Sequence, residues 1–235
     1  MRNRAAPSSH RESPPPSQGV ITAITHQAHD PERVSVFLDG VFAFGITRML
    51  AAEHGLAVGD ELSEERVAML RALDQEQQAL EAAFRLLTRR PRSEREIRER
   101  LERRGFPPPV IETVIGKLAA WRYVDDEAFA RYWVEQREAN RPRGRRLLAQ
   151  ELRHKGIDRE VIREALDDAD IDELAAARSL GEAKLLHYRQ LEPSIVRRRL
   201  GAYLMRKGFS YETVRAVMRD LLADSDESKE IGGEA

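Results

Sequence analysis

The sequence contains no cysteine, which excludes disulfide bonds, a thiol nucleophile and a zinc–thiolate site. It also lacks any apolar run that approaches the ~20 residues needed by a membrane-spanning helix. The first residues, MRNRAAPSSHRESPPPSQG, include basic side chains but no apolar stretch, so they do not resemble a secretory signal. We therefore expect a cytoplasmic protein.

Motifs that carry chemistry are absent as well. There is no Walker loop, no Rossmann glycine set and no G-x-S-x-G. The histidines show no ligand spacing, since even His26 and His29, three apart, fall in an expected loop. The pair Asp125-Asp126 could bind a metal ion, but capping of a helix is the favoured interpretation. The sequence predicts a binding protein with no enzymatic activity, no cofactor and no metal.

Aromatic residues are few, at 6%, whereas charged residues reach 34%. This composition suits thin helical layers better than one thick core. The net charge of −1 conceals an uneven distribution. Residues 141–155 and 195–215 each contain six basic residues and one acidic residue, and residues 220–235 contain six acidic residues and one basic residue. The two basic patches favour an anionic partner.

Secondary-structure signals change along the chain. Residues 1–18 are rich in Pro, Ser and Arg, which predicts a disordered extension. For residues 19–62 we predict a small β-rich segment with a short helix at 47–54. The strands are indicated by Asp39-Gly40, which separates two alternating apolar runs and is typical of a tight hairpin. Ser63, followed by acidic residues, marks the start of a helical region that continues to about residue 223. Residues 224–235 are expected to form an acidic flexible tail.

The helical region repeats itself around three glycines, Gly105, Gly156 and Gly208, which are 51 and 52 residues apart. Apolar residues recur eight and four positions before each glycine and one, six and ten positions after it. These sets are Ile97, Leu148 and Leu200; Leu101, Leu152 and Leu204; Phe106, Ile157 and Phe209; Ile111, Ile162 and Val214; and Ile115, Leu166 and Met218. Spacings of four place apolar side chains on one helix face. Each copy therefore predicts two amphipathic helices joined by a left-handed glycine.

A 51-residue period has room for a third helix in front of each pair, with candidates at 64–88, 126–138 and 172–187. The predicted fold is mainly α. It consists of three tandem three-helix repeats in an elongated curved body, preceded by a small antiparallel β-hairpin segment. The units are expected at residues 63–122, 123–170 and 171–223. An irregular helical bundle with accidental similarity is the alternative.

Basic residues recur in register too. Arg95, Arg146 and Arg198 stand ten positions before the glycines, and Arg104, Lys155 and Lys207 stand one position before them. The second set could simply complement helix dipoles, whereas the first set lies at helix starts, where dipoles do not favour positive charge. A helix-turn-helix reader of DNA bases is not supported, because the second helices are apolar and acidic. Contact with phosphates and a merely solvated surface both remain open.

The central stretch resembles the RecX family of regulators of the RecA recombinase. The resemblance lies in "WRYVDDEAFARYWVEQR" at 121–137 and "RPRGRRLLAQELRHKGI" at 141–157, and "LLTRRPRSEREIRERLERRGF" at 86–106 is similar to the first unit of that family. The matching signature residues are Tyr123, Asp125, Asp126, Phe129, Ala130, Trp133, Arg143, Gly144, Leu148, Leu152, Gly156 and Ile157.

The resemblance implies a monomer that binds RecA filaments on DNA and inhibits strand exchange and ATP hydrolysis by RecA. The candidate binding residues for RecA or DNA phosphates are Arg95, Arg104, Arg141, Arg143, Arg145, Arg146, Arg153, Lys155, Arg197, Arg198, Arg199, Arg206 and Lys207. One alternative is a nucleic-acid-binding helical repeat without a recombinase partner. Another is an adaptor whose arginines only solvate its surface.

Overall fold

The computed structural model describes residues 14–188 and 190–230, with side chains up to residue 223. Its described residues form two compact units. One contains the residues up to 82 together with 106–114, and the other contains 83–105 and the chain from 115 onward. The predicted extension falls mostly on residues 1–13, and the last five residues of the predicted tail are 231–235. Both stretches lie outside the described residues.

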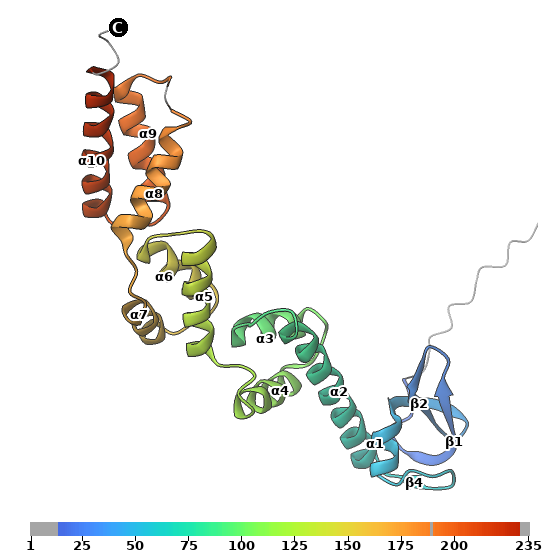
Figure 1. Cartoon of the computed structure of the whole chain (residues 1–235). Coiled ribbons are helices and arrows are strands. Elements are labelled where there is room, and N and C mark those ends of the chain that lie inside the picture. The colour runs from blue at the N-terminus through green and yellow to red at the C-terminus, as the bar shows by residue number, and fades with distance from the viewer. Residues whose placement is uncertain (1–13, 189, 231–235) are drawn as a thin grey trace, which may run out of the picture. The chain divides into compact units, whose positions relative to one another are not determined.

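The N-terminal segment is an antiparallel sheet (Figure 1). Its strands are β1 (Gly19–Gln27), β2 (Asp30–Leu38), β3 (Val41–Thr47) and β4 (Glu61–Leu62), in the order β3-β2-β1-β4. The predicted hairpin is confirmed, because Leu38 pairs with Val41 and both Asp39 and Gly40 have positive φ. One expectation was wrong: His26 lies in β1 and not in a loop.

The core of this segment explains how the sheet packs. Alternate residues of β2 and β3, such as Val36 and Phe44, are buried with Ile21 and with residues of helix α1 (Arg48–Glu53). The same cluster contains Leu70 from helix α2 (Glu64–Leu87). The helix start at Ser63 is confirmed, since its Oγ accepts a hydrogen bond from the N–H of Arg66 at 3.3 Å.

Helices make up the rest of the described chain (Figure 1). They are α3 (Glu94–Glu102), α4 (Pro108–Ala120), α5 (Asp126–Asn140), α6 (Arg145–His154), α7 (Arg159–Asp168), α8 (Glu173–Leu185), α9 (Pro193–Arg206) and α10 (Tyr211–Glu230). They follow the predicted order of three helices per repeat. The helical region was expected to end near residue 223, but α10 ends at Glu230.

The three glycine turns are confirmed as left-handed, with φ of +84° at Gly105, +85° at Gly156 and +89° at Gly208. At the second turn the N–H of Ile157 donates to the carbonyl of Leu152 at 3.1 Å, which satisfies a carbonyl at the end of α6. In these turns only glycine adopts the required backbone conformation at little cost.

Each of the second and third repeats has its own apolar core. In the second repeat, Phe129 and Ala130 of α5 pack with residues of α6 and α7. In the third, Ala177 of α8 packs with residues of α9 and α10, including Leu200 and Val217. The repeated apolar positions of the sequence are buried, except for Phe106 and Met218, which are partly exposed.

Candidate partner-binding surface

Most of the predicted binding residues are exposed arginines. Within the described part of the chain, their side chains form no ion pair or hydrogen bond, so their charges are available to a partner. They are Arg104, Arg141, Arg146, Arg153, Arg197, Arg198, Arg199 and Arg206. Except for Arg104 and Arg141, they all lie on α6 or α9, the middle helices of the second and third repeats.

The other predicted binding residues already have partners within the chain. Arg95 pairs with Glu99 along α3 at 2.8 Å, and Arg145 pairs with Asp167 of α7. Lys207 lies 5.5 Å from the ring centroid of Tyr203. Arg143 and Lys155 belong to a larger cluster, described next.

Trp133 and Glu151 organise that cluster in the second repeat. The Glu151 carboxylate accepts hydrogen bonds from Trp133 Nε1 at 2.9 Å and Arg137 Nε at 2.7 Å, and it pairs with Arg143 as well. The guanidinium of Arg137 lies 4.3 Å from the Trp133 ring centroid, and Lys155 Nζ lies 4.8 Å from it. Such cation–π contacts favour a positive charge against the indole. The cluster therefore stabilises the fold of this repeat.

Burial, hydrogen bonds and neighbouring charges shift the pKa values of Arg143 and Glu96. Desolvation lowers the pKa of Arg143, and the positive charges of Arg137 and Arg141 lower it further. Lys155 also pairs with Glu96 of the first repeat. Burial alone would raise the pKa of Glu96, but hydrogen bonds and charge from Arg90 and Lys155 outweigh it, so this pKa is lowered.

Besides the pair of Lys155 with Glu96, two hydrogen bonds between described residues attach the second repeat to the first. Ser93 Oγ, at the start of α3, donates to the carbonyl of Lys155 at 2.7 Å. The N–H of Glu94, the first residue of α3, donates to Asp126 Oδ1 at 2.9 Å. We call such a pair of hydrogen bonds a repeat joint. Its first bond reaches the end of the middle helix of the next repeat, and its second reaches the start of that repeat's first helix.

The same joint attaches the third repeat to the second. The N–H of Gly144 donates to the carbonyl of Lys207 at 2.9 Å, and the N–H of Arg145, the first residue of α6, donates to Glu173 Oε1 at 2.7 Å. Ser93 and Gly144 both stand twelve positions before a repeat glycine, and Lys155 and Lys207 both stand one position before one. The repetition in the sequence is therefore matched by repeated contacts between its units.

Close backbone approach accompanies each joint. A Cβ at Gly156 would lie 2.7 Å from the side chain of Arg95, and a Cβ at Gly208 would lie 2.3 Å from the Cβ of Leu147. These glycines thus serve both the left-handed turn and the fit between repeats. The third repeat differs, because α9 begins at Pro193, fifteen positions before its glycine, whereas α3 and α6 begin eleven positions before theirs.

The two acidic residues of the central signature, Asp125 and Asp126, cap helices of two different repeats. Asp125 caps its own helix by accepting from the N–H of Ala128 at 2.9 Å, which confirms the capping interpretation. Asp126 instead caps α3. Desolvation raises the pKa of Asp126 despite the opposing hydrogen bond from Glu94, and the nearby negative charges of Glu94 and Asp125 add to this increase.

Sequence reasoning did not identify Glu96, Glu151 or Glu173 as structural partners of the basic residues. A signal for Glu173 was present, because Asp172-Glu173 stands at the start of α8 as Asp125-Asp126 does at the start of α5. Asp172 indeed caps α8 by accepting from the N–H of Ala175 at 2.9 Å. No comparable local pattern marks Glu151.

Family models cover most of the chain. The model of the RecX N-terminal domain matches residues 19–63, and the models of the first, second and third RecX three-helix domains match residues 79–118, 125–166 and 170–218. These matches follow the strand segment and the three repeats in order.

Individual relatives agree with this assignment. The "Regulatory protein RecX" of Bacillus velezensis is 31% identical over 90% of this chain and 81% of its own length. That of Geobacillus kaustophilus is 33% identical over 86% of this chain and 77% of its own length. A crystal structure titled "regulatory protein RecX" matches 84% of this chain and 98% of its own, with a TM-score of 0.66 and 26% identity. RecX from Lactobacillus salivarius has the same fold over 63% of this chain and 97% of its own, with a TM-score of 0.56 and 22% identity.

Proposed function

Because the chain belongs to the family of RecX regulatory proteins, we propose that it binds the RecA filament on DNA and inhibits strand exchange and ATP hydrolysis by RecA. It does so without catalysis of its own. The single observation that supports this most directly is the set of exposed arginines on α6 and α9 that have no ion-pair partner among the described residues, held by units that recur along the chain.

A repeated binding surface suits a repeated partner. Arg146 and Arg198 occupy equivalent positions in the second and third repeats, and both are exposed without an ion pair in the described structure. A filament presents the same surface many times, so two weak contacts on one chain strengthen each other through effective concentration. Arg143 and Arg145 are less suitable for such contacts, since both are already held by carboxylates of this chain.

The test is a double charge reversal, Arg146→Glu with Arg198→Glu. DNA-dependent ATP hydrolysis by RecA is measured while the protein is titrated in. If each arginine contributes ~1 kcal/mol, the half-inhibitory concentration should rise roughly tenfold or more. The matched control is Arg159→Glu, which reverses an exposed arginine at the start of α7, where a negative charge is compatible with the helix dipole.

Unchanged inhibition by a folded double variant would reject these two residues as contacts. Co-sedimentation with DNA, in the presence and absence of RecA, separates this proposal from DNA binding alone. Direct phosphate binding predicts sedimentation without RecA and a steep loss of binding with salt. Binding through RecA predicts sedimentation only when the filament is present.

A further inference from the structure

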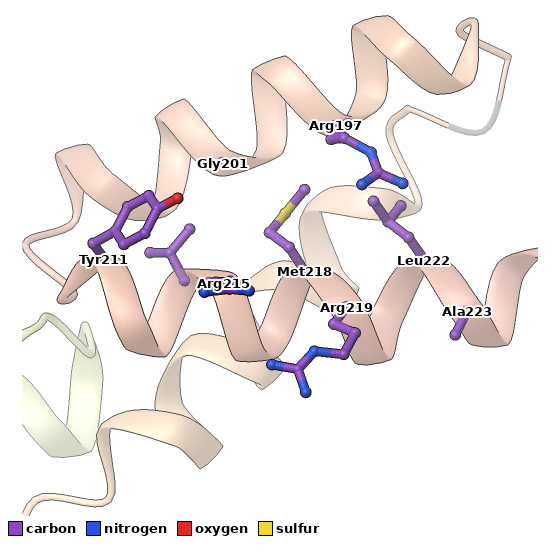
Figure 2. Close-up of a pocket in the computed structure, with 9 residues that line it drawn as sticks. Arg197, Gly201, Tyr211, Arg215, Met218, Arg219, Leu222 and Ala223 are labelled. Atoms are coloured by element: carbon purple, nitrogen blue, oxygen red, sulfur yellow. The ribbon is translucent and has the colours of Figure 1, made fainter.

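A groove of about 550 Å³ runs between α9 and α10 in the third repeat (Figure 2). Its apolar lining comes from α10, where Val214, Met218 and Leu222 follow one another at helical spacing. On the opposite side, Gly201 of α9 leaves the space open, since a Cβ built there would meet nothing within 4 Å. Tyr211 lines one end of the groove, and the residue is 69% exposed.

Three arginines surround this lining. Arg197 comes from α9, and Arg215 and Arg219 come from α10 (Figure 2). All three are exposed, and none forms an ion pair with a described residue. Arg215 and Arg219 also lie four residues apart on one helix, where like charges repel each other. The groove is therefore positively charged and has an apolar floor.

The second repeat shows how the same positions are neutralised. Arg145, Arg163 and Asp167 are the equivalents of Arg197, Arg215 and Arg219, counted from the repeat glycines. Asp167 pairs with Arg145, and it pairs with Arg163 at 3.4 Å. In the third repeat an arginine stands where this carboxylate stands in the second. Among the described side chains the third repeat has no carboxylate paired with these arginines, and one supplied by another molecule would restore the neutralisation.

We propose that the groove between α9 and α10 binds an acidic protein segment that carries an apolar side chain between its carboxylates. The arginines would pair with the carboxylates, and the apolar side chain would cover Met218 in the space beside Gly201. The aliphatic floor favours this occupant over a single-stranded nucleic acid. Sequence-tolerant binding of bases depends on aromatic platforms in series, and Tyr211 is the one aromatic residue among the described residues of the lining. This inference goes beyond the proposed function and does not depend on RecA.

The experiment uses the full chain and a fluorescein-labelled synthetic peptide in which pairs of glutamates flank a leucine. Binding is followed by fluorescence anisotropy, without RecA. The variant Arg219→Asp gives the third repeat the charge pattern of the second, so Arg197 gains a carboxylate within its own repeat. We expect this variant to bind the peptide at least roughly tenfold more weakly than the unaltered chain does. A peptide with glutamine in place of glutamate should bind the unaltered chain as weakly as the glutamate peptide binds the variant.

A second variant addresses the apolar floor without changing any charge. Gly201→Leu places a side chain in the open space, and because leucine favours helix it is expected to preserve α9. It should weaken peptide binding as well, whereas Arg159→Glu on α7 should leave it unchanged. Circular dichroism confirms the fold of each variant.

Three results would overturn the proposal. The first is equal binding of the glutamate and glutamine peptides. The second is unchanged peptide binding by folded Arg219→Asp and Gly201→Leu variants. The third is tighter binding of an oligothymidylate than of the peptide, with the same dependence on these variants, which would assign the groove to nucleic acid. None of these results bears on inhibition of RecA, so the two proposals can fail separately.

Discussion

At Gly144, a Cβ would lie 2.2 Å from the carbonyl oxygen of Gly208 and 2.3 Å from the nitrogen of Phe209. Both are backbone atoms, which cannot move aside as a side chain can. We expect Gly144→Ala to lower the free energy of unfolding by about 1–3 kcal/mol, as measured by urea denaturation. The matched control is Gly116→Ala in α4, where a Cβ meets nothing within 4 Å. That change should be neutral or stabilising by up to about 1 kcal/mol, and equal effects of the two would contradict the close fit.

Glu96 gives a pH-dependent prediction. Its pKa is lowered in the folded protein because the hydrogen bonds from Arg90 and Lys155 outweigh its desolvation. A lowered pKa means that the contribution of Glu96 to stability is present above its unfolded-state pKa of about 4.3 and is lost as the pH falls through the folded-state pKa. Glu96→Gln should therefore be less stable than the unaltered chain at pH 7. The difference in free energy of unfolding should shrink towards pH 3, and a constant difference would contradict the assignment.

At the scale of secondary-structure elements, the repeat joint requires a hydrogen-bond acceptor but not a charge. Asp126→Asn keeps an oxygen for the N–H of Glu94 and removes a carboxylate whose pKa is raised mainly by burial. We expect no loss of stability from this change at pH 7, whereas Asp126→Ala should cost about 1 kcal/mol, as the loss of other helix caps does. The equivalent pair in the third repeat, Glu173→Gln and Glu173→Ala, should behave in the same way in thermal unfolding. An equal loss for the amide and alanine variants would show that charge matters more than the hydrogen bond, because both substitutions remove the charge and only alanine removes the acceptor.

The elements were more predictable than the contacts between them. Helix starts such as Ser63 and Asp125 were found because a cap bonds to a residue three positions away, within the same stretch of sequence. The bond of Ser93 to Lys155 joins residues 62 positions apart, so no local pattern could indicate it. The roles of Arg143 and Lys155 were hidden for the same reason, since Glu151 and Glu96 reach them through the fold. The elongated, curved arrangement expected from the repeats stays a prediction.

For the whole molecule, binding in series makes a prediction about combinations of variants. If the second and third repeats contact neighbouring parts of one filament, reversal of Arg146 alone or Arg198 alone leaves the other repeat attached. Each single variant should then raise the half-inhibitory concentration in the RecA ATPase assay modestly. If the double variant abolishes attachment altogether, its fold-increase in half-inhibitory concentration should exceed the product of the two single fold-increases. A double variant no weaker than the worse single variant would indicate that only one repeat binds.

The early start of α9 limits how far this architecture can be extended. α9 begins at Pro193, fifteen positions before its glycine, whereas α3 and α6 begin eleven positions before theirs. Val196 and Arg197, which correspond to Gly144 and Arg145, therefore lie inside α9, and the N–H of Val196 donates to the carbonyl of Glu192 at 2.9 Å. A further unit added behind the third would find neither donor of the joint free. An engineer who wished to lengthen the protein would first have to replace the start of α9 with that of α6.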